Sequence, residues 1–259
     1  MKKILFTSVC VCAAVALCSV FANGKDKTKG TLPDLLEVKA ASGISIKRTG
    51  YRAIYNKEWR LPMAVSWQLT RNHLSGPNKR SGLTFEEDQT VPRPRATNFD
   101  YYNSGYSRGH MCPAGDNKWD KKALQETFLF TNICPQLYSL NAGDWNDLEQ
   151  QCRTWARKYG SVYIICGPIL MNQRHRTIGR NKVVVPEAFY KVVLRMDKDG
   201  KSGKGIGFIY RNEKAKKSMA SYVNSIDQVE RLTGLDFFAA LPDNIENRIE
   251  AEANINDWQ

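Results

Sequence analysis

Histidine is scarce in the sequence, and the cysteine spacing of structural metal centres is missing. Its 259 residues include only three histidines, His73, His110 and His175. No two cysteines have the Cys-x-x-Cys spacing of structural zinc sites, which argues against such a site. The chain also shows no internal repeat, which argues against a repeat architecture.

Acidic residues are scarce relative to basic ones. Lys and Arg number 38 against 26 Asp and Glu, which gives a formal net charge of +12 at pH 7. Because each Lys or Arg that neutralises a phosphate releases counterions, this excess favours a polyanionic partner, and nucleic acid first. Charge alone does not exclude a basic protein with a solvated surface and no phosphate partner.

Long apolar runs are missing outside the start of the chain. Residues 1–22 place two lysines before an apolar run and small residues near Ala22, which is typical of a secretory signal cut after Ala22. The run is short for a membrane span, so we expect export to the periplasm or the exterior and no stable membrane association. A lipidated Cys18 is an alternative, which the bulk of Leu17 disfavours. Without residues 1–22 the chain has 36 basic and 26 acidic side chains, a formal charge of +10.

Four cysteines would remain after such a cut: Cys112, Cys134, Cys152 and Cys166. An even number in an exported protein is compatible with two disulfides, whose pairing the sequence leaves open. Cys112 lies two residues after His110, so a thiol nucleophile with its base is an alternative use of this pair. We disfavour it because exported cysteines are more often oxidised.

Apolar patterning predicts an α+β domain with a central, largely antiparallel sheet flanked by helices. Strands are expected over 51–56, 63–69, 128–133, 162–166, 183–185, 188–196 and 205–210. Helices are expected over 117–126 and over 143–159, the second with Gly160 as its cap. A last helix is expected to begin at Ser225 and to end near Gly234.

The remaining segments set the domain organisation. Residues 71–100 combine prolines with many charges and predict a long surface loop of the kind that often carries function. We divide the chain into a signal over 1–22, a flexible segment over 23–45 and a single domain over 46–259.

One stretch holds two functional side chains on either side of a glycine. In an extended strand Arg108 and His110 point to the same face, and Gly109 leaves the backbone open to the close approach of a ligand. Histidine accepts a proton near neutral pH, and arginine holds a phosphate through two parallel hydrogen bonds. A base and a fixed cation would then face one substrate, although a buried histidine beside a surface arginine gives the same triplet.

Three segments together resemble the DNA/RNA non-specific endonuclease family, the ββα-metal enzymes that include endonuclease G. They are Ser107-Arg108-Gly109-His110, Asn132-Ile133-Cys134-Pro135-Gln136, and Asn141 followed by Trp145 and Leu148-Glu149. The separations of 31 residues from His110 to Asn141 and 8 residues from Asn141 to Glu149 are also similar to the family's. The resemblance extends from about Tyr51 to Phe238 and implies the ββα-metal nuclease fold.

The resemblance implies a role for each matching residue. His110 would be the general base that takes a proton from the attacking water, and the products would carry 5′-phosphates. Asn141 would be the direct protein ligand of one Mg²⁺, with Mn²⁺ as a possible substitute. Glu149 would hold the water on this metal, and Arg153 would position Glu149 or stabilise the transition state. Arg108 would grip a phosphate next to the cleavage point.

Further implied residues support these groups. Asn132 and Gln136 would hold the backbone of the site, and Arg80 in the long loop matches another family arginine. The partners would be DNA and RNA contacted through phosphates, which carry no base information. Many relatives dimerise, so a homodimer is a further expectation.

Structural roles compete with several of these assignments. Asn141 could simply cap a helix, and Glu149 with Arg153 has the spacing of an ordinary surface pair. The family usually has Asp where this chain has Ser107, and alternation points Ser107 away from Arg108, so its loss should affect strand support more than chemistry. The chief functional alternative is a catalytically weak nucleic-acid-binding module that kept the fold.

The other prominent side chains are assigned structural positions. A core position is expected for Trp145, Leu148, Cys152 and Trp155, and a surface position for His73 and His175. If the family resemblance holds, a Cys112–Cys134 disulfide would tie the two site segments together.

Overall fold

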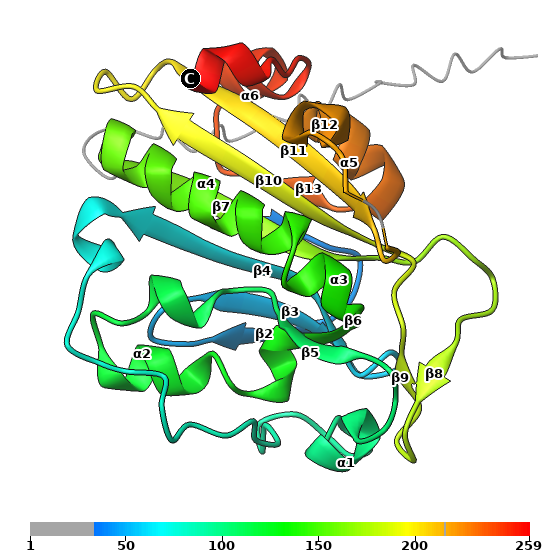
Figure 1. The fold of residues 1–259 in the computed structure, drawn as a ribbon. Coiled ribbons are helices and arrows are strands. Elements are labelled where there is room, and N and C mark those ends of the chain that lie inside the picture. Colours follow the sequence, from blue (N-terminus) through cyan, green and yellow to red (C-terminus); the bar gives the residue numbers. More distant parts are fainter. Residues whose placement is uncertain (1–33, 215) are drawn as a thin grey trace, which may run out of the picture. The chain divides into compact units, whose positions relative to one another are not determined.

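The computed structural model describes residues 34–214 and 216–259 (Figure 1). The expected signal, 1–22, and the first part of the flexible segment lie outside the described residues. A seven-stranded sheet has the order β12-β11-β10-β7-β4-β3-β2, and all its neighbouring strands are antiparallel. The α+β class with a largely antiparallel sheet is therefore confirmed.

The strands of this sheet follow the apolar patterns of the sequence. They are β2 (Ile44–Lys47), β3 (Arg52–Asn56), β4 (Leu61–Thr70), β7 (Ser161–Ile169), β10 (Ala188–Met196), β11 (Gly203–Arg211) and β12 (Val223–Asn224). Successive side chains of a strand point to opposite faces. In β10, Phe189 and Val193 join one core cluster, while Tyr190 and Val192 join another. The sheet therefore has an apolar core on each face.

The first face of the sheet is covered by α4 (Asp144–Tyr159), which lies in front of the strands in Figure 1. Its apolar stripe is buried in the same core cluster as Phe189 and consists of Trp145, Leu148, Cys152 and Trp155. The helix ends at Gly160, whose φ of +90° favours glycine. The predicted helix, its cap and the core position of its stripe are confirmed.

The second face of the sheet is covered by α5 (Ile226–Thr233) and α6 (Asp243–Glu250). Ile226, Val229 and Ile249 pack there with Tyr190 and Val192. The capping box of Ser225 and Gln228 is present, as predicted. The expectation that α5 is the last helix is wrong, because α6 follows it with too few apolar residues for a strong helical pattern.

A separate two-stranded ribbon pairs β5 (Ser107–His110) with β6 (Ile133–Gln136). The expected strand over 128–133 is wrong, because Phe130–Asn132 form a 3-10 turn, η3, and the extended segment begins at Ile133. The segment 34–45, expected to be flexible, also differs. It contains β1 (Val38–Lys39), which pairs with β13 (Asp236–Phe237), a partner too distant in sequence to be seen locally.

Short elements complete the described part. These are α1 (Asn98–Tyr101), α2 (Lys121–Glu126), α3 (Tyr138–Asn141), the ribbon of β8 (Thr177–Ile178) with β9 (Val183–Val184), and the 3-10 turns η1 (Arg71–Leu74), η2 (Ala114–Asp116), η4 (Met219–Tyr222) and η5 (Ile255–Trp258). Among the described residues, no helix is both long and apolar enough to cross a membrane.

The four described cysteines are buried and free, which contradicts the expected disulfides. Gly109 lies opposite Cys134 in the ribbon, so Cys112 falls beyond the paired region and does not face Cys134. The thiol of Cys112 instead lies 3.2 Å from the side-chain amide of Asn117.

Candidate active site

The β5–β6 ribbon explains why glycine stands between Arg108 and His110. A Cβ at position 109 would lie only 2.7 Å from the Cβ of Gln136, closer than side-chain atoms approach one another. The space at Gly109 that was expected to admit a ligand is instead filled by the side chain of Gln136. Gln136 is fully buried, and packing here fixes the ribbon below the site.

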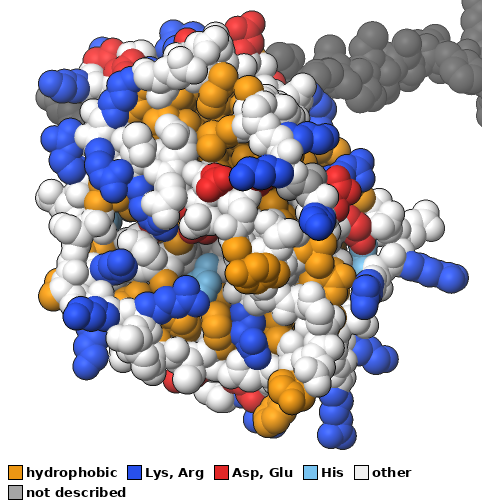
Figure 2. Space-filling model, viewed as in Figure 1, with side chains coloured by type: hydrophobic (Ala, Val, Ile, Leu, Met, Phe, Trp, Pro, Cys, Tyr) orange, Lys and Arg blue, Asp and Glu red, His pale blue; other side chains and the backbone are white. Residues whose placement is uncertain are grey.

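A cleft of about 570 Å³ collects the predicted site residues. Its lining includes Arg80 from the long loop, Arg108 and His110 from β5, Asn141 from α3, and Glu149 and Arg153 from α4. Figure 2 shows this face, where a histidine surface lies in a hollow among Lys and Arg side chains. All six residues predicted to contact substrate or metal therefore share one cleft.

His110 sits at the cleft with its ring mostly enclosed. The residue is 9% exposed, and its ring lies 5.3 Å from the ring of Phe85 and 5.1 Å from that of Phe128. Burial, followed by the charge of Arg80, lowers the pKa of His110 from 6.5 to about 3. Its Nε2 atom has no hydrogen-bond partner among the described residues. The imidazole is therefore neutral near pH 7, and before substrate binds it is a weaker base than an exposed histidine.

Two arginines are held beside aromatic rings at the cleft. The Arg108 guanidinium lies 5.5 Å from the ring centroids of Phe85 and of Tyr101, and its Nη2 donates to the carbonyl of Asn98 at 3.1 Å. The guanidinium of Arg80 lies 5.4 Å from the ring of Phe128. Within residues 34–214 and 216–259, neither arginine forms a salt bridge. Both cations are available to an incoming anion.

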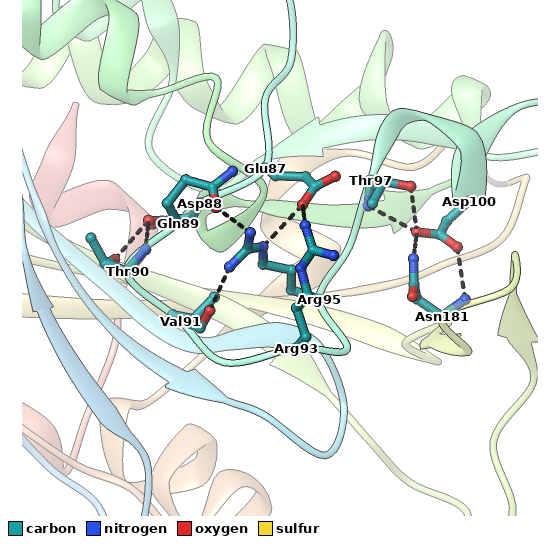
Figure 3. Close-up of polar contacts among 10 residues, drawn as sticks. All are labelled: Glu87, Asp88, Gln89, Thr90, Val91, Arg93, Arg95, Thr97, Asp100 and Asn181. Carbon is teal, nitrogen blue, oxygen red and sulfur yellow. Dashed lines mark hydrogen bonds and ion pairs between the residues drawn. The ribbon is translucent and has the colours of Figure 1, made fainter.

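The loop ahead of β5 is anchored by two polar networks (Figure 3). Arg95 donates to Glu87 at 3.0 Å, to the carbonyl of Val91 at 2.9 Å and to Gln89. Asp100 accepts hydrogen bonds from Thr97 and from Asn181; the donor-to-oxygen distances are 2.8–2.9 Å. Asp100 thereby fixes α1, the helix whose Asn98 carbonyl receives Arg108.

Glu149 and Arg153 form more than a surface pair. Arg153 Nη2 lies 3.5 Å from Glu149 Oε2, and both side chains are more than 85% buried. Arg153 Nε donates to Asp116 at 2.6 Å, and Asp116 also accepts from Trp67 Nε1 at 3.1 Å. The arginine thus bridges two carboxylates, one of which faces the cleft. The expected position of Arg153 next to Glu149 is observed.

A buried lysine lies beneath this group. Lys191 in β10 is fully buried, and its ammonium lies 4.3 Å from the ring centroid of Trp145 and 5.2 Å from that of Trp67. Trp145 precedes Glu149 by one turn of α4. Burial raises the pKa of Glu149 from 4.5 to about 7, and the charges of Lys191 and then Arg153 oppose this rise.

Sequence reasoning missed Asp116 and Lys191. Lys191 could have been noticed as a single lysine inside the apolar strand 188–196. Burial of a charge costs free energy unless the charge has a partner. The only sequence signal for Asp116 was its position six residues after His110. Its role depends on contacts with α4 and β4 that the local sequence does not reveal.

Asn141 ends α3 rather than capping α4, whose N-cap is Gly143, so the capping alternative is wrong. The other oxygen-bearing side chains near it in the cleft include Asn146, Glu149 and Gln150, and no cysteine lines the cleft. Amide and carboxylate oxygens suit a hard cation such as Mg²⁺. The residues present therefore fit a magnesium ion.

Of the two expected supporting residues, Asn132 bonds to the backbone of the site, whereas neither polar side-chain atom of Gln136 has a hydrogen-bond partner among the described residues. Asn132 is fully buried; it accepts from the Cys112 amide at 2.8 Å and donates to the carbonyls of Cys112 and Thr127, both at 2.9 Å. It thus joins the end of β5 to the turn before β6. Cys112 is fully buried outside the cleft, and burial raises the pKa of its thiol well above the usual range, which excludes the thiol-nucleophile alternative.

The other two histidines lie outside the cleft. His73 stacks on Trp119 with ring centroids 4.5 Å apart, and His175 Nδ1 lies 3.0 Å from Glu187 Oε1. Both are half-buried rather than fully exposed, because each ring has a packing or polar partner.

Comparison with known proteins decides the family. The model of the DNA/RNA non-specific endonuclease family matches residues 34–244. The chain belongs to this family. A solved relative of the non-specific endonuclease domain comes from the crystal structure of a complex of EndoG with EndoGI. It matches with a TM-score of 0.74 and 28% identity, over 78% of this chain and 88% of that chain. The predicted nuclease fold is thereby confirmed.

Several curated proteins that are similar to this chain are named nucleases. The mitochondrial nuclease EXOG of Danio rerio is 36% identical over 206 residues, which are 74% of this chain and 60% of that protein. Mitochondrial endonuclease G of Homo sapiens is 31% identical, over 80% of this chain and 71% of that protein. A nuclease of Nostoc is 29% identical, over 90% of this chain and 83% of that protein. The chain spans only about 60% of the length of the EXOG protein it matches.

Proposed function

We propose that this protein is an endonuclease that hydrolyses phosphodiester bonds of both DNA and RNA, with His110 as the general base and one divalent metal ion. The observation that carries this proposal is the cleft itself. A neutral buried histidine, two arginines without salt bridges and a set of oxygen ligands converge on one opening. Family membership supports the same reaction class.

Each residue of the cleft has a task in this reaction. Arg108 and Arg80 hold phosphate oxygens on either side of the bond that breaks. The imidazole of His110, which lines the cleft, accepts the proton of the attacking water. Burial is the main cause of the lowered pKa of His110, and the charge of Arg80 adds to it. A phosphate bound beside Arg80 offsets this second contribution, so binding of substrate makes the base stronger.

The metal would be held by Asn141, with Glu149 fixing its coordinated water. When bound there, Mg²⁺ or Mn²⁺ supplies positive charge that stabilises the developing charge on the phosphate and the leaving 3′ oxygen. Arg153 and Asp116 keep the Glu149 carboxylate in place, and Lys191 and Arg153 favour its ionised form. The products carry 5′-phosphates.

Recognition through phosphates explains action on both nucleic acids. Phosphate contacts carry no base information and do not depend on the sugar. The net charge of +12 supports attraction to either polymer. We also propose that the protein works after export, in the periplasm or outside the cell, and that it forms a homodimer.

The test is cleavage of plasmid DNA and of single-stranded RNA by the purified chain, with Mg²⁺ and with EDTA. Cutting of both polymers that requires the metal and leaves 5′-phosphate ends supports the proposal. Tight binding of both polymers without cutting would instead identify a nucleic-acid-binding module that kept the fold.

A further inference from the structure

A cluster of carboxylates lies on the other face of the sheet from the cleft. Asp227 and Glu230 belong to α5, and Glu250 is the last residue of α6. One oxygen from each of these three side chains lies within 4.8 Å of the others. The helices pack on the core cluster that contains Tyr190, whereas α4 packs on the cluster with Phe189. The carboxylate cluster is therefore separate from the candidate active site.

Glu250 is the unusual member of this carboxylate cluster. It is only 4% exposed, and its Oε1 atom is buried with no hydrogen-bond partner among the described residues. A buried carboxylate without a partner is costly, and the cost falls only if the group gains a proton or a cation. Its place among two other carboxylates makes a bound divalent cation effective, because one ion offsets most of the negative charge of all three.

No positive side chain supplies this neutralisation. Within residues 34–214 and 216–259, no salt bridge reaches Asp227, Glu230 or Glu250. Lys39 lies nearby but pairs with Asp236 at 3.0 Å. This deficit occurs in a chain with 38 basic residues, so the lack of a local cation is not a consequence of composition.

We propose that Asp227, Glu230 and Glu250 bind a divalent cation, of which Ca²⁺ is the best match, and that this ion joins α5 to α6. Calcium accepts several carboxylates in flexible geometry and completes its shell with water. Glu230 is already oriented, since its Oε1 accepts from the Phe237 amide at 2.7 Å. The ion would have a structural role and would take no part in phosphodiester cleavage.

The experiment uses a variant without the proposed catalytic metal site, so that any metal binding measured comes from the carboxylate cluster. The full chain carrying His110→Ala and Asn141→Ala is stripped with EDTA, and its Tm is then measured with Ca²⁺, with Mg²⁺ and with EDTA; calorimetry measures Ca²⁺ binding directly. At saturating Ca²⁺ we expect Tm to rise by about 5 to 10 °C, the shift that tight binding to a domain of this size produces. Adding Glu250→Gln should abolish the rise.

Two further variants keep the inference testable. Glu252→Gln changes an exposed glutamate two residues away and should leave the Ca²⁺ effect intact. Asp227→Asn, on the less buried side of the cluster, should weaken the binding at least about tenfold, and it serves if Glu250→Gln fails to fold. Absence of a cation-dependent shift and of calorimetric binding in the starting variant would overturn the proposal, as would a full Ca²⁺ effect in Glu250→Gln.

Discussion

At the residue scale, the ionisation of Glu149 depends on cations that flank it on two sides. Arg153 contacts it at 3.5 Å from the next turn of α4, and Lys191 lies behind Trp145 in the core. Burial works against both, because it raises the pKa of Glu149 to about 7. A carboxylate that fixes a metal-bound water must be ionised, so the flanking cations should decide the pH at which the enzyme works.

Lys191→Met tests this dependence, because it keeps the apolar stem of the side chain and removes the charge. The pKa of Glu149 should rise further, so the cleavage rate near pH 7 should fall by about tenfold and recover near pH 9. A pH–rate profile measures this shift. Lys198→Met, an exposed control, should leave the profile unchanged. A loss of rate that is equal at all pH values would contradict the role of Lys191.

His110 should also leave a mark on stability in acid. The unfolded chain protonates this histidine below a pKa of 6.5, whereas the buried ring resists protonation until about pH 3. The folded-state pKa is lowered, so the free energy of unfolding falls as the pH falls through this window, by at most about 1.4 kcal/mol per pH unit.

His110→Gln lacks the titrating group, so urea midpoints measured between neutral and acid pH should fall less steeply in this variant than in the natural chain. If the urea midpoints of the two proteins fell equally steeply with pH, the ring of His110 would not be held neutral by burial.

At the element scale, α1 and the loop before it act as a support for Arg108. Asp100 holds α1 through bonds to Thr97 and Asn181, and α1 presents the Asn98 carbonyl to Arg108. The arginine that we propose to contact substrate thus depends on a carboxylate that does not line the cleft.

Asp100→Ala leaves four partly buried donor atoms of Thr97 and Asn181 without an acceptor. We expect it to lower the free energy of unfolding by about 2 to 4 kcal/mol in urea denaturation. It should also weaken nucleic-acid binding, since Arg108 loses its support. Asp100→Asn keeps one acceptor oxygen, so its free energy of unfolding should fall by roughly half as much as that of Asp100→Ala. Equal stability of Asp100→Ala and the natural chain would refute this account of the loop.

Elements with strong local patterns could be predicted from the sequence, and others could not. The apolar stripe from Trp145 to Trp155 and the alternation in β3 and β4 are local signals, and they gave the main helix and the sheet. β1 is two residues long and pairs with a segment near the other end of the chain. The strand expected over 128–133 became a turn because Asn132 bonds to the backbone of Cys112.

The candidate site shows the same division. The six cleft residues could be named because their order and spacing resemble a known family, and the structure brings them together. The residues that tune the site depend on contacts across the fold. Asp116 lies on η2 and accepts a hydrogen bond from Arg153 on α4, and Lys191 lies on β10 and contacts Trp145 on α4. Neither contact leaves a pattern in the local sequence.

At the scale of the whole molecule, the excess of basic residues should govern affinity for nucleic acid. Binding measured by fluorescence anisotropy should weaken linearly on a plot of log affinity against log salt, with similar slopes for single-stranded DNA and RNA. Arg80→Ala should reduce the slope by about one unit for both polymers, because it removes one phosphate contact. Arg231→Ala, an exposed control on α5, should leave it unchanged. Different effects of Arg80→Ala on DNA and RNA would mean that Arg80 reads the sugar.

The measurement that tests the central claim most directly compares cleavage with binding in His110→Ala. The account predicts that the variant loses at least about a hundredfold in the rate of cleavage of both DNA and RNA, because it lacks the base. Its affinity for both polymers should stay within about threefold, because the phosphate contacts of Arg80 and Arg108 remain. His175→Ala, which lies outside the cleft, should keep both properties. Cleavage that survives in His110→Ala, with folding and binding intact, would contradict the assignment of His110 as the base.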